Sequence, residues 1–210
     1  MLHVAILGSG KGSNFQAILN AIQRGEVTNV QIKVVISNNP DAGILKIARA
    51  NEIPAVHLSQ RLYTSETEFL DAMLGTLRQY ATDFIVLAGY MKQLHPRVVG
   101  AYKNRVINIH PALLPKHGGK GMYGMHVHEA VVANRETVSG ATVHMVDEEL
   151  DHGAIILQKQ VRIEPDDTPE KVAARVLQVE HEIYPQALCL FAEGKIAVTG
   201  NAVTVHRFAR

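Results

Sequence analysis

An amide and an imidazole stand two residues apart in the segment Arg105–Pro115. The residues around them between positions 106 and 109 are β-branched and apolar, which favours a buried strand. Alternate residues of a strand point to the same face, so Asn108 and His110 are expected side by side near its end. Such a pair can bind an oxyanion and move a proton. A core strand with a capped end explains the same residues equally well.

A second polar group is the acidic segment Asp147–Gly153. A carboxylate beside an imidazole favours the charged form of the ring, so Asp151 could serve His110 in this way if the segment folds over the sheet edge. Sequence spacing does not show that the two meet. An acidic connection taken alone is more often a solvated turn.

A glycine-rich turn, Gly8–Asn14, follows the first apolar run. It does not match the dinucleotide-binding motif G-x-G-x-x-G, because Ser13 stands at the position of the third glycine. It does not match a P-loop either, because the segment does not end in G-K-[ST]. The second strand also ends in Ser37–Asn39 rather than in an acidic residue. A glycine turn with Ser13 and Asn14 at a helix N-terminus offers free N–H groups to an anion. We expect a single phosphate here; the alternative is an ordinary strand-to-helix turn.

Eleven histidines raise the question of a metal site. His126 and His128, followed by Glu129, look like ligands, but no H-E-x-x-H motif or cysteine pair accompanies them. Residues two apart on a helix diverge, so we expect no metal. His144 lies in an apolar strand and is expected to be a satisfied core histidine or a support behind the site.

The first half of the chain alternates strands and helices. Apolar runs predict strands near residues 2–7, 32–36, 55–58, 83–89 and 105–110, and helical spacing predicts helices near 15–22, 44–48 and 69–80. Near-continuous apolar strands joined by helices indicate a mostly parallel sheet with helices on both faces.

The pattern changes after Pro115. A loop with four glycines precedes a helix at 127–134, and two strands at 139–146 and 154–163 could pair antiparallel. Thr168 and Pro169 start a further helix, which Pro185 is expected to kink or interrupt. The tail from Lys195 predicts a last antiparallel hairpin.

Composition bounds the remaining possibilities. The 210 residues predict one domain, 1–210, with a phosphate-binding half (1–100) and a half that carries the candidate catalytic residues (101–210). A net charge of +1 gives no strong field for nucleic acid, and no run approaches the roughly 20 apolar residues of a membrane helix. The single cysteine excludes an internal disulfide. We expect a cytoplasmic monomer or homodimer that acts on small molecules and binds neither nucleic acid nor membrane.

Five segments together resemble the folate-dependent formyltransferases, most closely the branch that acts on phosphoribosylglycinamide in purine synthesis. These segments are Gly8–Asn14, Leu87–Met91, Asn108–Pro115, Glu149–Gly153 and Glu180–Pro185. The resemblance covers nearly the whole chain and implies that the half 101–210 is catalytic and folate-binding. It implies a Rossmann-like fold and transfer of a formyl group from 10-formyltetrahydrofolate, a co-substrate, to the amine of N1-(5-phospho-D-ribosyl)glycinamide, with no metal.

The resemblance also implies roles for individual residues. Asn108, His110 and Asp151 would be the catalytic trio, with Asp151 keeping His110 charged and oriented. The substrate phosphate and glycinamide would be bound by Gly12, Ser13, Asn14 and Glu180. The folate site would be lined by Met91, Lys92, Gln93, Leu94, Asn108, Asp147, Glu148, Glu149, Leu150 and Asp151.

The chain departs from the family pattern on the folate side. Lys92 stands where an arginine is common in the family, so a planar guanidinium that can donate two parallel hydrogen bonds is replaced by a compact ammonium group. An arginine that some members carry in the helix after residue 60 has no clear counterpart.

Three alternatives stay open. A methionyl-tRNA formyltransferase would need a nucleic-acid domain and a basic surface, and a formyl-folate hydrolase usually carries an N-terminal regulatory domain. A nucleotide-sugar binding module without activity would not need the trio.

Overall fold

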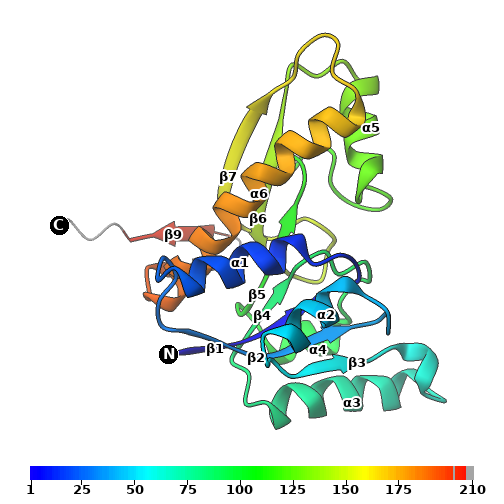
Figure 1. Ribbon diagram of the computed structural model, residues 1–210, viewed down its shortest axis with the longest axis vertical. Coiled ribbons are helices and arrows are strands. Elements are labelled where there is room, and N and C mark those ends of the chain that lie inside the picture. Colours follow the sequence, from blue (N-terminus) through cyan, green and yellow to red (C-terminus); the bar gives the residue numbers. More distant parts are fainter. Residues whose placement is uncertain (201, 207–210) are drawn as a thin grey trace. The chain divides into compact units, whose positions relative to one another are not determined.

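The computed structural model describes residues 1–200 and 202–206 (Figure 1). The chain divides into two compact units, Met1–Ile107 and Asn108–Arg210. The division falls within strand β5 (Val106–His110), so each unit holds part of that strand. The main sheet has the strand order β3-β2-β1-β4-β5-β6-β7.

Unit 1 carries the parallel part of the sheet. Strand β1 (Leu2–Leu7) pairs in parallel with β2 (Val30–Ser37) and β4 (Phe84–Leu87), and β2 pairs in parallel with β3 (Ala55–His57). All four residues of β4 are buried, as expected of a strand covered on both faces. The helices of this unit are α1 (Ser13–Gln23), α2 (Gly43–Ala50), α3 (Glu66–Gln79), α4 (Pro96–Ala101) and the 3₁₀ helix η1 (Gln60–Leu62).

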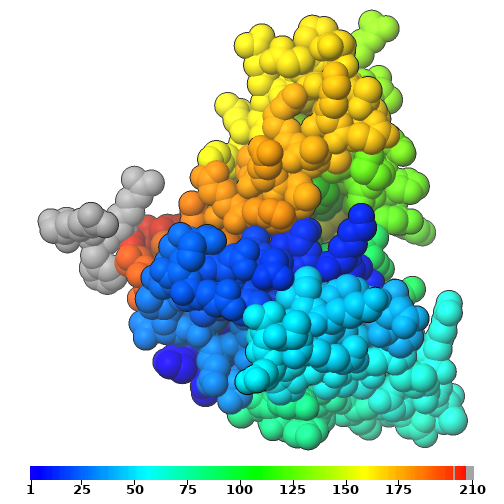
Figure 2. All heavy atoms as spheres, viewed as in Figure 1, coloured from blue at the N-terminus to red at the C-terminus, as the bar shows by residue number. Residues whose placement is uncertain are grey.

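Unit 2 is built on an antiparallel pair, β6 (Val138–Met145) and β7 (Ile155–Arg162). Strand β6 is buried after its first residue, whereas β7 is mostly exposed or half-buried. Helix α6 (Pro169–Ala192) packs on both strands and on α5 (Met125–Ala133), and Figure 2 shows its orange atoms at the surface. Strands β8 (Ile196–Thr199) and β9 (Ala202–Val205) form a separate antiparallel hairpin.

The predicted elements are largely confirmed, including the mostly parallel sheet and the C-terminal hairpin. Sequence patterns missed η1 and α4, which are only three and six residues long. The expected interruption at Pro185 is wrong, because α6 continues through it. Pro185 is buried together with Tyr184 and Leu188, so packing offsets the one helical hydrogen bond that proline cannot donate. Within the described residues, no helix is long and apolar enough to cross a membrane.

Candidate active site

His110, at the end of β5, has acceptors beside both of its ring nitrogens. Its Nε2–H donates to the carbonyl oxygen of His117 over 2.8 Å, and its Nδ1 lies 3.5 Å from Oδ2 of Asp151. The ring is only 4% exposed. An imidazole protonated on both nitrogens would satisfy both neighbours. The structure therefore brings His110 and Asp151 together, which the family resemblance implied and sequence spacing alone did not show.

Asp151 reaches this position from the connection between β6 and β7. Its backbone is left-handed, with φ of 56°, and its side chain is 12% exposed. Oδ2 accepts a hydrogen bond from the N–H of Gly119 over 3.0 Å, and Oδ1 lies 3.6 Å from Nε2 of His144. The carboxylate is thus held between two histidines and a backbone donor.

His144 connects Asp151 to Asn108. Its Nδ1–H donates to the carbonyl of Met145 over 2.7 Å, so Nε2 is unprotonated in the neutral ring and accepts from Nδ2 of Asn108 over 3.2 Å. Burial lowers the pKa of His144, which outweighs the opposing effects of the Met145 carbonyl and the Asp151 carboxylate. A neutral His144 therefore orients the Asn108 amide, a role more specific than the support expected from sequence.

The glycine-rich turn Gly8–Asn14 of unit 1 leads into a helix start with no side-chain cap. Gly12, the N-cap of α1, has φ of 84°, and the first turn of α1 carries no acidic residue. A Cβ at Gly12 would lie 2.8 Å from Cα of Ile44, so only glycine fits beside α2. This helix start therefore offers backbone N–H groups and a positive dipole end to an anion.

Side-chain contacts that sequence reasoning missed hold the same loop. Ser9 donates through Oγ to Oδ1 of Asn38 over 2.5 Å and accepts from the N–H of Met91 over 2.8 Å. Three segments that follow β1, β2 and β4 are thereby joined. Ser, Asn and a glycine-rich turn after successive parallel strands were the signal available for this contact.

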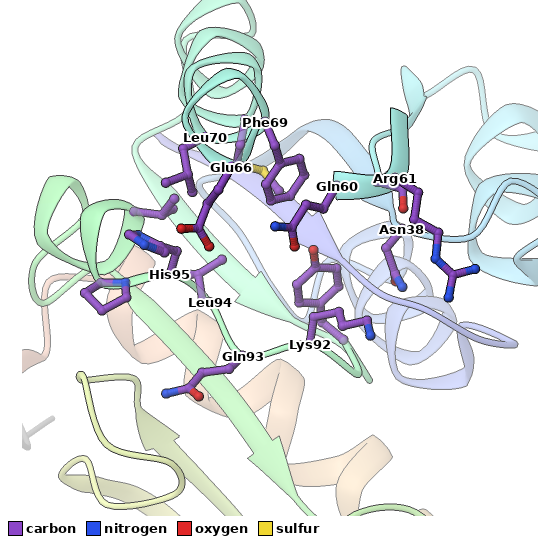
Figure 3. A pocket seen from close by; sticks show the side chains of 15 residues that line it. Asn38, Gln60, Arg61, Glu66, Phe69, Leu70, Lys92, Gln93, Leu94 and His95 are labelled. Atoms are coloured by element: carbon purple, nitrogen blue, oxygen red, sulfur yellow. The ribbon is translucent and has the colours of Figure 1, made fainter. Parts of the chain in front are cut away.

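A pocket of about 490 Å³ lies in the same unit (Figure 3). Its apolar wall is formed by Phe69, Leu70, Met73, Leu94 and Val98, and its polar side chains include Asn38, Gln60, Arg61, Glu66, Lys92 and Gln93. Burial raises the pKa of Tyr90, another lining residue, so its hydroxyl is a neutral hydrogen-bonding group. Three of the four residues expected in the folate site between 91 and 94 thus line a real cavity. Met91 is 49% exposed and does not line it.

The remaining residues predicted for the folate and glycinamide sites lie in unit 2. Asp147 accepts the N–H of Glu149 over 2.9 Å, Glu148 and Leu150 are exposed, and Glu180 is buried on α6. His126 is exposed while His128 is buried, so the two side chains diverge as expected. Among the described residues, no group of three histidine, cysteine or acidic side chains could hold a metal ion.

Residues 2–188 match the family described as Formyl transferase. The chain belongs to the formyl transferase family. It is 38% identical over 201 residues to phosphoribosylglycinamide formyltransferase of Haemophilus influenzae, an alignment that covers 96% of this chain and 92% of that protein. It is 40% identical over 194 residues, 92% of this chain, to the chloroplastic phosphoribosylglycinamide formyltransferase of Arabidopsis thaliana. The chain spans less than two thirds of the plant relatives' length, 66% in Arabidopsis thaliana and 62% in Vigna unguiculata.

The fold agrees with a solved member of this formyl transferase family. The crystal structure of glycinamide ribonucleotide transformylase 1 from Symbiobacterium toebii matches with a TM-score of 0.91 and 38% identity. The match covers 98% of this chain and 94% of that one. The predicted Rossmann-like formyltransferase fold is confirmed.

Proposed function

We propose that this protein transfers a formyl group from 10-formyltetrahydrofolate to the amine of phosphoribosylglycinamide, a step of purine synthesis. The observation that carries the proposal is the linked cluster of Asn108, His144, Asp151 and His110 in a formyl transferase chain. Relatives named phosphoribosylglycinamide formyltransferase, aligned over most of this chain, support the choice of acceptor.

The cluster can stabilise the charge that formyl transfer creates. The substrate amine attacks the formyl carbon, a nitrogen–carbon bond forms, and the former carbonyl oxygen becomes an oxyanion. The Asn108 amide and the protonated His110 donate hydrogen bonds to that oxyanion, usually the largest catalytic contribution. The bond from carbon to N10 of the folate then breaks, and the proton lost by the amine reaches N10.

The geometry of His110 indicates which of its nitrogens would donate. Nε2 is committed to the His117 carbonyl at 2.8 Å, whereas Nδ1 is 3.5 Å from Asp151, longer than the roughly 2.7–2.9 Å of a charge-assisted hydrogen bond. We therefore assign the donor role to Nδ1–H. Asp151 stabilises the charged ring and can accept the amine proton, directly or through water.

Unit 1 would bind the substrate phosphate at the start of α1. Gly12, Ser13 and Asn14 form this helix start, and Glu180 of unit 2 is proposed to bind the glycinamide part. Support comes from the uncapped N-terminus and from the absence of acidic residues in its first turn.

The pocket in unit 1 is proposed to take part of the folate. Its apolar wall suits an aromatic ring system, and Lys92 and Arg61 are cations for the carboxylates of the folate tail. Arg61, in η1, is proposed to take the place of the folate-side arginine that has no clear counterpart in the helix after residue 60. Met91, Gln93, Leu94 and the segment Asp147–Asp151 are proposed as further folate contacts.

A turnover assay tests the proposal. Purified protein is mixed with 10-formyltetrahydrofolate and phosphoribosylglycinamide, and folate absorbance is followed with time. We expect folate release only when both substrates are present. Release without phosphoribosylglycinamide would instead indicate a formyl-folate hydrolase, and binding without release would indicate a binding module. The proposed setting is the cytoplasm, with 10-formyltetrahydrofolate as co-substrate and no metal.

A further inference from the structure

Glu136, which follows α5, contacts two consecutive side chains, Lys116 and His117, at the start of the loop Lys116–Gly124. Its Oε1 lies 2.7 Å from Nζ of Lys116 and 3.2 Å from Nε2 of His117, and its Oε2 accepts from Lys116 over 2.8 Å. Its side chain is 17% exposed, and the hydrogen bond from Lys116 is the main reason that the pKa of Glu136 is lowered. The carboxylate is therefore charged and engaged at both oxygens.

The clamped loop touches both members of the His110–Asp151 pair. The carbonyl of His117 accepts from His110 Nε2, and two residues later the N–H of Gly119 donates to Asp151 Oδ2. Gly118, between these two residues, packs closely against Leu114 and Asp151. A Cβ added at Gly118 would lie 2.6 Å from Cδ2 of Leu114 and 3.2 Å from Cβ of Asp151.

The backbone of His117 explains why a clamp is needed. His117 is a non-glycine residue with φ of 56°, in the left-handed region that L-residues adopt at a cost. Such a conformation persists when surrounding contacts hold it. The His117 side chain, only 9% exposed, contacts Oε1 of Glu136 through its Nε2, so the carboxylate helps to hold the carbonyl that orients His110.

We propose that Glu136 is a positioning residue for formyl transfer: by clamping Lys116 and His117, it keeps the His117 carbonyl on Nε2 of His110. This fixes the ring with Nδ1 towards Asp151. The inference rests on the proposed function for its catalytic consequence, but the contact itself can be measured without turnover.

The test compares Glu136→Ala with Glu129→Ala, which removes an exposed carboxylate from α5 in the same unit. Glu136→Asp is the conservative variant. The first readout is long-range ¹H–¹⁵N NMR of the histidine rings, with the His110 signals assigned by their loss in His110→Asn. The second is kcat and both KM values in the turnover assay. Thermal unfolding checks that each variant folds, and Lys116→Met replaces Glu136→Ala should that variant not fold.

We expect the His110 ring signals to shift in Glu136→Ala and to stay in place in Glu129→Ala. The value of kcat should fall on the order of ten- to a hundredfold, because a small misplacement of a catalytic group lowers the rate by such factors. The KM values should change little. Glu136→Asp should recover part of both. Unchanged His110 signals would overturn the proposal, whether or not kcat falls, and so would an unchanged kcat. Shifted signals in a protein whose wild type shows no turnover would reject the proposed function while retaining the clamp.

Discussion

Nδ2 of Asn108 donates to Nε2 of His144 over 3.2 Å. Nδ1–H of His144 donates a hydrogen bond to the Met145 carbonyl, so in the neutral ring Nε2 carries no hydrogen and can only accept from Asn108. The contact therefore fixes which end of the Asn108 side chain carries the N–H donors. The second hydrogen of that amide stays available for a substrate oxygen.

Replacing Asn108 tests this donor. Asn108→Ala should lower kcat on the order of 10²–10³-fold, the usual cost of removing one oxyanion donor, with much smaller changes in KM. Asn134→Ala, which removes an exposed amide after α5, is the control and should leave kcat unchanged. Steady-state kinetics give both values. A loss below tenfold would show that the amide does not stabilise the transition state.

A charge at the start of α1 tests phosphate binding. Ser13→Asp should raise KM for phosphoribosylglycinamide far more than KM for the folate, because it places like charge beside the phosphate. Stability should not fall, since an acidic residue favours a helix N-terminus. Asn20→Asp adds the same charge later in α1 and should leave both KM values alone. Equal increases in the two KM values for Ser13→Asp would contradict the assignment.

Gly12 and Gly10 give a matched pair for the packing of this loop. Gly12→Ala forces a side chain onto Ile44 at a φ of 84°, which should destabilise the protein by about 1–3 kcal/mol. A Cβ at Gly10 meets nothing within 4 Å, so Gly10→Ala should change stability little. Denaturant unfolding of both variants measures the difference. Equal stabilities would mean that the loop does not depend on the left-handed turn.

Two buried histidines and one half-buried histidine predict how stability changes with pH. Burial lowers the pKa of His128, His144 and His181 below the ordinary value of 6.5. The unfolded chain then binds more protons than the folded one, so stability should be constant above about pH 7.5 and fall as pH drops through 6.5. Each histidine contributes a limiting slope of about 1.4 kcal/mol per pH unit.

Unfolding free energies measured from pH 8 to 5.5 check this dependence. His181→Gln should flatten the curve, whereas His126→Gln, at an exposed position, should not. Stability that rises as pH falls would contradict the burial argument.

The parts of the site that share one strand could be predicted, because strand periodicity alone places Asn108 beside His110. The helix start at Ser13 could also be predicted, because a glycine turn follows the first strand and apolar residues then recur at helical spacing. The approach of Asp151 could not, because it depends on the length of the β6–β7 connection and on a left-handed residue within it.

Contacts that depend on the path of a long loop were also beyond the sequence. Glu136 reads as an ordinary surface carboxylate, and only the folded loop shows that it binds Lys116 and His117. The same holds for η1, whose three residues carry no periodicity, yet Gln60 and Arg61 line the pocket.

Asp151→Asn tests the account most directly, because this carboxylate lies 3.5 Å from Nδ1 of His110. The isosteric change retains the acceptor for Gly119 N–H but removes the charge. We predict a loss of kcat on the order of 10²–10³-fold with nearly unchanged KM for both substrates. Asp166→Asn, at an exposed acid of unit 2, should behave as wild type. A near-normal kcat in Asp151→Asn would contradict the account and require a different residue to stabilise the charge of His110.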